Sequence, residues 1–92
     1  MKTIYKYKLQ ADSNFNIKIE MPIGAEILTM QTQNGEPYIW AIVNPDPEEE
    51  KEIRNFEIRE TGSPIRREGK YVGTDQILGG ALVFHVFEVD KG

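Results

Sequence analysis

Hydrophobic and polar residues alternate with a period of two along much of this chain, a pattern that predicts β-strands. The clearest alternation covers residues 15–21. Its inward-facing positions are expected to be Phe15, Ile17, Ile19 and Met21. Residues 3–9 alternate in the same way, with lysines on one face, and the turn-forming residues 11–14 separate the two segments. Two consecutive strands are therefore expected at the start of the chain.

Asn34-Gly35 is the strongest turn signal in the sequence, because both residues tolerate the positive φ angles of a two-residue type I′ turn. It lies between residues 25–33 and residues 36–44, which we expect to form the arms of a β-hairpin. The second arm is apolar on both faces, with Tyr38, Trp40 and Ile42 on one side and Ile39, Ala41 and Val43 on the other. This pattern predicts a central strand, with Trp40 in the core or in the wall of a pocket.

The next segment, residues 44–50, combines two prolines with an acidic run and predicts a solvated loop. Residues 52–61 return to a strand pattern in which Phe56 and Ile58 face inward. Ile53 falls on the opposite parity, so we expect a β-bulge near Arg54 or Asn55. Glycine, serine and proline then mark residues 62–69 as a connection, and residues 70–78 predict a strand that Gly73 weakens.

The C-terminal residues 81–89 are apolar on both parities and contain the single histidine, His85. A strand of this kind is either central in a packed fold or covered by a second subunit. A chain of 92 residues gains much from association, so we expect a homo-oligomer that assembles through this strand. Taken together, the segments predict one all-β domain over residues 1–92, with about seven mainly antiparallel strands in a sandwich or a partly open barrel.

Composition narrows the possible partners. The formal charge of −4 argues against duplex DNA or an anionic membrane as the main partner. The alternating N-terminus has no continuous apolar segment typical of a signal peptide or a membrane span, so we expect a cytoplasmic protein. The absence of cysteine excludes disulfides and cysteine-ligated metals.

The sequence has no recognisable catalytic motif, and we expect neither an enzyme nor a cofactor or metal site. His85 is the one side chain suited to general base catalysis at neutral pH, but within an apolar strand it is more typical of a packed or pocket-lining residue. A small hydrolase that pairs His85 with Glu88 or Asp75 is the less favoured alternative. The acidic residues near Glu48 lack the spacing of a calcium loop and indicate a solvated surface.

The segment from Thr61 to Arg67 has the chemistry of an anion site, because its glycine, hydroxyls and two adjacent arginines suit a phosphate. Its arginines could instead pair with Glu60 or Glu68 on the surface. Aromatic residues at Tyr38, Trp40 and Tyr71 could stack a base, although aromatics at strand spacing are more often core. The predicted ligand-binding residues are Trp40, Thr61, Ser63, Arg66, Arg67, Gln76 and His85.

Several segments together resemble a family of small conserved hypothetical proteins of tailed bacteriophages and prophages. They are residues 2–7, 20–25, 33–35, 39–41, 61–65 and 71–74, and the C-terminal Leu78-Gly79-Gly80-Ala81-Leu82-Val83-Phe84-His85-Val86-Phe87-Glu88. The resemblance implies a phage accessory protein in the cytoplasm of the infected bacterium. Some phage proteins of this size are homo-oligomeric sponges that sequester cyclic nucleotide immune signals of the host, and such a sponge is the expected function. The alternative is a protein-interaction module that inhibits a host factor or serves virion assembly.

Overall fold

The computed structural model describes residues 1–90, and every side chain among them except those of Ile77 and Leu78. Within this range the chain forms seven strands and a short 3₁₀ turn. They are β1 (Thr3–Lys8), β2 (Asn16–Pro22), β3 (Glu26–Gln33), β4 (Glu36–Val43), β5 (Lys51–Glu60), β6 (Lys70–Ile77), η1 (Leu78–Gly80) and β7 (Leu82–Val89). The prediction of an all-β domain of about seven strands is confirmed. No helix in this part of the chain is long and apolar enough to cross a membrane.

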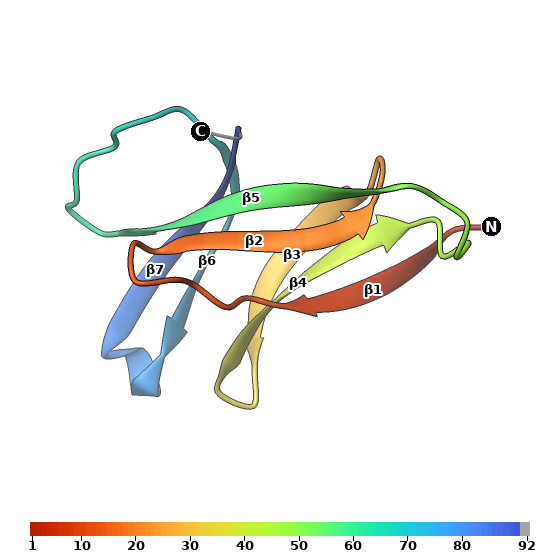
Figure 1. Cartoon of the computed structure of the whole chain (residues 1–92). Coiled ribbons are helices and arrows are strands. Elements are labelled where there is room, and N and C mark those ends of the chain that lie inside the picture. Colours follow the sequence, from red (N-terminus) through yellow and green to blue (C-terminus); the bar gives the residue numbers. More distant parts are fainter. Residues whose placement is uncertain (91–92) are drawn as a thin grey trace.

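The strands form two antiparallel sheets, which Figure 1 shows as separate layers. The first sheet has the order β1-β4-β3 and the second β2-β5-β7-β6. Edge strands β3 and β6 lie side by side, and the Thr32 backbone N–H donates a hydrogen bond to the Asp75 carboxylate across them. The two sheets are therefore joined at this corner, while β1 and β2 occupy the edges on the other side.

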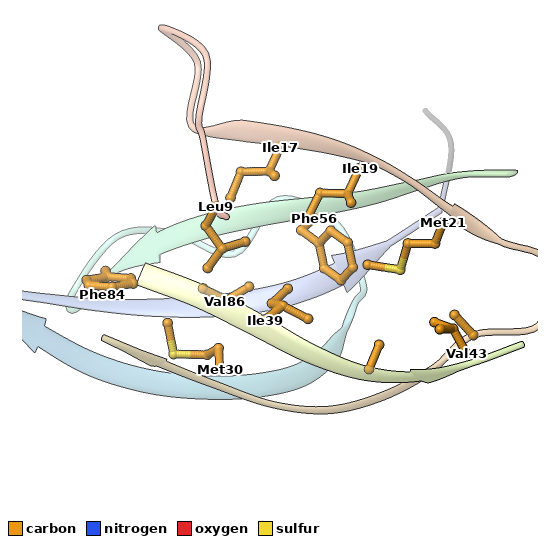
Figure 2. Close-up of a cluster of buried hydrophobic side chains, with 12 residues drawn as sticks. Leu9, Ile17, Ile19, Met21, Met30, Ile39, Val43, Phe56, Phe84 and Val86 are labelled. Carbon is orange, nitrogen blue, oxygen red and sulfur yellow. The ribbon is translucent and has the colours of Figure 1, made fainter. Parts of the chain in front are cut away.

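The hydrophobic core lies between the sheets and takes side chains from both (Figure 2). Phe56 lies at its centre and is fully buried. Its other buried members are Leu9, Ile17, Ile19, Met21, Ala25, Met30, Ile39, Ala41, Val43, Phe84 and Val86. The strict alternation of β2 is confirmed by the burial of Ile17, Ile19 and Met21.

Phe15 does not follow that alternation, and its predicted inward orientation is wrong. Its φ is +64° and half of its surface is exposed. The cause is the turn before β2, where the Asp12 carboxylate accepts hydrogen bonds from the backbone N–H groups of Asn14 and Asn16. This turn places Phe15 in the left-handed region, one residue before the strand begins.

The hairpin at Asn34-Gly35 forms as predicted, with φ angles of +54° and +81° at the two turn residues. On β4, Ile39, Ala41 and Val43 are buried, but the opposite face is partly exposed. Trp40 lies on that outer face, so its expected place in the core or a pocket wall is wrong. The strand is central because both of its edges are paired, yet its sheet is an outer layer and its second face meets solvent.

The bulge predicted in β5 is also wrong. The β2–β5 register is continuous from Asn16↔Glu57 to Pro22↔Lys51, and Ile53 simply faces outward with 47% of its surface exposed. Register shifts occur instead in β3, between Ile27 and Thr29, and in β6, between Tyr71 and Gly73. A Cβ at Gly73 would lie 2.8 Å from Met30 Cγ, so glycine allows the close approach of β6 to β3.

Strand β7 lies between β5 and β6 and is paired along both edges. Phe84 and Val86 face the core, whereas Val83, His85 and Phe87 alternate with them and are partly exposed. The packed core therefore accounts for the inward apolar residues of β7, while its outer apolar residues meet solvent. Oligomerisation through β7 stays a prediction, and it would have to use the outer face of the sheet rather than a strand edge.

Candidate functional site

The seven predicted ligand-binding residues lie in three different places. Ser63, Arg66 and Arg67 line one groove at the loop between β5 and β6, which extends away from the sheets in Figure 1. The outer face of the second sheet carries His85 and Gln76, and Thr61 bonds to His85 there. Trp40 lies on the outer face of the first sheet. The structure thus brings the loop residues together but separates them from Trp40.

The loop between β5 and β6 is held against β5 by Glu57. This carboxylate accepts a 2.8 Å hydrogen bond from Nε of Arg59 and another of 2.8 Å from Nε of Arg67. Arg67 also reaches Asn16 Oδ1 at 3.3 Å, which links the loop to the start of β2. The predicted surface pairing of the arginines with Glu60 or Glu68 is therefore wrong for Arg67, whose partner is Glu57.

Arg59 is a central residue of this cluster that the sequence did not single out. Its side chain is 8% exposed, its guanidinium carbon lies 4.3 Å from the centre of the Phe87 ring, and Nη2 donates a 2.7 Å hydrogen bond to the Arg67 carbonyl. A charged residue at an outward-facing strand position gives no local signal of burial. The available hint was Glu57, an opposite charge two residues earlier on the same face.

Acid is expected to weaken this anchor. Partial burial favours a raised pKa for Glu57, but the hydrogen bonds and charges of Arg59 and Arg67 outweigh it and hold the Glu57 pKa below its usual range. A carboxyl with a lowered folded-state pKa stabilises the protein above its unfolded-state pKa, and this contribution is lost as the pH falls through the folded-state value. The urea midpoint of the native protein should therefore exceed that of Glu57→Gln at pH 7, and the gap should shrink towards pH 3. A gap that stays constant with pH would contradict this role.

The groove beside this anchor has a volume of about 460 Å³ and lies between the turn before β2 and the loop after β5. Its lining residues are Asn14, Phe15, Asn16, Glu57, Ile58, Arg59, Glu60, Ser63, Pro64, Arg66 and Arg67. Arg66 is exposed, and its side chain has no hydrogen-bond or ion-pair partner among the residues that the structure describes. The groove therefore presents a cation that a ligand could engage.

A second groove, of about 320 Å³, lies next to the first and is mainly apolar. Phe15, Ile58 and Glu60 line both grooves, so the two share a wall. The remaining residues of the second groove are Ala11, Asp12, Pro37, Leu82 and Phe84. Together they form what we call the two-part groove, cationic at the loop and apolar beyond Phe15.

His85 lies in a chain of hydroxyl groups rather than beside an acid. Its Nε2 is 2.8 Å from Thr61 Oγ1, and its Nδ1 is 2.8 Å from Thr74 Oγ1, which is in turn 2.7 Å from the Tyr71 hydroxyl. The supposed partner Glu88 instead binds Arg54. Both ring nitrogens are thus occupied, and the histidine ties the start of the loop to β6.

The described residues contain no group of three or more histidine, aspartate or glutamate side chains arranged to hold a metal ion. In comparisons with known proteins, a family model described as a domain of unknown function, DUF7352, matches residues 1–92. No curated protein and no solved structure matches the chain. Because the family model spans the full sequence, this chain belongs to the DUF7352 family.

Proposed function

We propose that this protein binds a phosphorylated nucleotide, without transforming it, in the two-part groove. The observation that carries the proposal is that Phe15 borders both an apolar groove and one lined by Arg59, Arg66 and Arg67. A nucleotide has the same division, with a planar base at one end and phosphate at the other. Base stacking is favourable on an aromatic ring, and guanidinium groups form strong bonds to phosphate.

Phe15 is suited to the base because its ring is half exposed and its backbone is fixed. The Asp12 carboxylate holds the turn through two backbone N–H groups, and the Phe15 N–H itself bonds to the Asp12 carbonyl at 3.1 Å. A left-handed backbone at a non-glycine residue is uncommon and is often found at ligand sites. A pre-formed platform lowers the entropy that is lost on binding.

Arg66 and Ser63 are suited to the phosphate. Arg67 already bonds to Glu57 and Asn16, so it holds the shape of the loop. Arg66 is exposed at the same groove and would supply the bond to the ligand, with the Ser63 hydroxyl as an additional donor. Four of the predicted ligand-binding residues do not line this groove and are not part of the proposed site, namely Trp40, Thr61, Gln76 and His85.

The resemblance to small phage proteins suggests a biological role for this binding, namely sequestration of a host signal. A protein that holds a host nucleotide signal at high concentration lowers the free signal by mass action, and no chemistry is required. The proposed location is the cytoplasm of the infected bacterium. The proposed homo-oligomer would use the outer face of β6 and β7, where Tyr71 is 57% exposed and Val83, His85 and Phe87 are partly exposed.

Isothermal titration calorimetry with cyclic dinucleotides and ADP-ribose derivatives tests the proposal. Arg66→Ala should weaken binding by about 1.5 to 3 kcal/mol, the contribution of a hydrogen bond to a charged group. Lys18→Ala, which removes an exposed cation outside the groove, is the matched control and should leave the affinity unchanged.

The fate of the ligand separates the candidate functions. Recovery of the intact nucleotide after denaturation of the complex is expected for a binding protein, whereas a cleaved product would support the hydrolase. Absence of binding to every nucleotide tested would contradict the proposal. A stoichiometric protein partner without any small ligand would then favour the protein-interaction module.

A further inference from the structure

The outer face of the first sheet carries a second group of residues with recognisable chemistry. The antiparallel register places Lys6 and Thr29 beside Trp40, and Lys8 and Gln31 beside Tyr38. The same register places Ile4 beside Ile42. We call this surface the aromatic face, and its residues are Ile4, Lys6, Lys8, Thr29, Gln31, Tyr38, Trp40 and Ile42. Two carboxylates lie at its border, because Glu26 is opposite Ile42 and Glu36 accepts a 3.2 Å hydrogen bond from the Tyr38 hydroxyl.

Two aromatic rings lie at the centre of this face, on the middle strand β4. The ring centres of Tyr38 and Trp40 are 6.0 Å apart, and their planes meet at 61°. Both rings keep part of their surface in solvent, and Ile4 at the border is 56% exposed. The core lies on the opposite side of the strand, where Ile39 and Ala41 are fully buried. The rings are thus held by the sheet and remain open to a ligand.

Positive charge borders the rings along β1. Residues 1–11 contain three lysines and no acidic residue, although the whole chain carries a net charge of −4. Lys6 Nζ lies 4.5 Å from the centre of the Tyr38 ring and bonds to Gln33 Oε1 at 2.9 Å. Lys8 bonds to Glu36 at 3.1 Å, but both side chains are about half exposed, and such surface pairs contribute little. Both ammonium groups can therefore exchange these contacts for a phosphate.

We propose that the aromatic face binds single-stranded nucleic acid, with bases stacked on Trp40 and Tyr38 and phosphates held by Lys6 and Lys8. A flat sheet that presents aromatic rings beside cations suits unpaired bases, because every base has a face that can stack. The bases of a duplex are already stacked and paired, so this face has no means of engaging them. Thr29 and Gln31 add polar groups at the height of the two rings, which suits base edges better than the apolar surface of a second subunit.

This site is distinct from the two-part groove. The aromatic face belongs to the β1-β4-β3 sheet, whereas the loop arginines belong to the β2-β5-β7-β6 side of the molecule. None of the eight residues of the aromatic face lines either part of that groove. A negative result for nucleotide binding in the two-part groove therefore does not contradict nucleic-acid binding on the aromatic face, and the reverse also holds.

Trp40 is the single tryptophan in the chain, so its fluorescence reports directly on the proposed contact. Titration with the oligonucleotides dT12 and rU12 at low salt should quench this fluorescence, and anisotropy of the labelled oligonucleotides should rise in parallel. The plot of log affinity against log salt should have a slope of about −1.4, as expected for two phosphates of a single strand. Comparison of dT12 with rU12 distinguishes DNA from RNA as the preferred strand. Binding without any change in the fluorescence would overturn the proposal.

Variants separate stacking from general charge attraction. Trp40→Leu keeps an apolar side chain but removes the ring, and should weaken binding about tenfold, within the range for loss of one stacked base. Lys6→Glu leaves both rings in place and should also weaken binding. The matched controls are Lys18→Glu, an equal charge reversal on exposed β2, and Arg66→Ala in the two-part groove, and neither should alter the affinity.

Three results would count against the site. Equal losses in Lys6→Glu and Lys18→Glu would show non-specific attraction to the whole surface. Loss of binding in Arg66→Ala with full binding in Trp40→Leu would assign the oligonucleotide to the groove. The third result combines two measurements. If the native protein sediments as a dimer and binds no oligonucleotide, while Trp40→Leu sediments as a monomer, this face is a contact between copies of the chain.

Discussion

Phe56→Ala is expected to lower the free energy of unfolding by about 3 to 5 kcal/mol, the range for removal of a buried aromatic ring. The Phe56 side chain has no exposed surface, and Figure 2 shows its ring among side chains from both sheets. A domain of 92 residues has a total stability of roughly 5 to 14 kcal/mol, at about 0.05 to 0.15 kcal/mol per residue. One substitution should therefore remove a large share of that total, which urea denaturation followed by circular dichroism will measure.

Ile65→Ala is the control for this prediction. Ile65 lies in the loop between β5 and β6 with 69% of its surface exposed, so its replacement should change the free energy of unfolding by no more than about 0.5 kcal/mol. If Phe56→Ala cost as little as Ile65→Ala, the two sheets could not be packed around Phe56.

The parts of the fold that follow from local pattern were predictable. Strict alternation identified β2 and three of its buried residues, and Asn34-Gly35 identified the hairpin and its turn type. In both cases the relevant physics acts between residues a few positions apart. Side-chain parity decides which face is buried, and the steric cost of positive φ decides which residues can form the turn.

The wrong predictions for Trp40 and Ile53 have a different cause. Each depends on whether the other sheet or solvent covers a given face of the strand. Both faces of β4 are apolar, and the sequence does not indicate that only one of them packs against the other sheet. The core or pocket-wall position predicted for Trp40 is therefore wrong, because Trp40 lies on the other face. The parity of Ile53 predicted a bulge, whereas the isoleucine is exposed in a strand of regular register. Exposed apolar residues are common on folded proteins, and parity alone cannot distinguish an exposed one from a shifted register.

The candidate site was predictable in its residue types but not in its construction. The serine and arginines of the loop after β5 were identified from their chemistry and do line a groove. Its other wall, around Phe15 and Asn16, comes from a turn about fifty residues earlier, and the Arg67–Asn16 contact that joins them is set by the tertiary fold. Sequence spacing carries no information about such a pairing.

The ion pair between Arg54 on β5 and Glu88 on β7 lies within the second sheet, at the end where Arg54 also reaches the segment before β3. Both oxygens of the Glu88 carboxylate accept hydrogen bonds from the Arg54 guanidinium, through Nε and, at 3.0 Å, through Nη2. Arg54 Nη1 donates a third hydrogen bond, of 2.7 Å, to the Ala25 carbonyl that precedes β3. Glu88 raises the pKa of Arg54, mainly through these hydrogen bonds and against the effect of burial. The two side chains are 17% and 21% exposed, so the pair is shielded from solvent.

Glu88→Gln is expected to lower the free energy of unfolding by about 2 to 3 kcal/mol, somewhat less than the full cost of breaking a buried pair because both groups keep some exposure. Glutamine preserves the shape of the side chain but leaves the Arg54 charge without its main partner. The matched control is Glu36→Gln in the exposed Lys8–Glu36 pair, where a much smaller change is expected because solvent screens the two charges. The double variant Arg54→Met with Glu88→Leu removes both charges, and should be more stable than Glu88→Gln because no unpaired charge remains. Equal urea midpoints for Glu88→Gln and Glu36→Gln would show that the shielded pair contributes no more than a surface one.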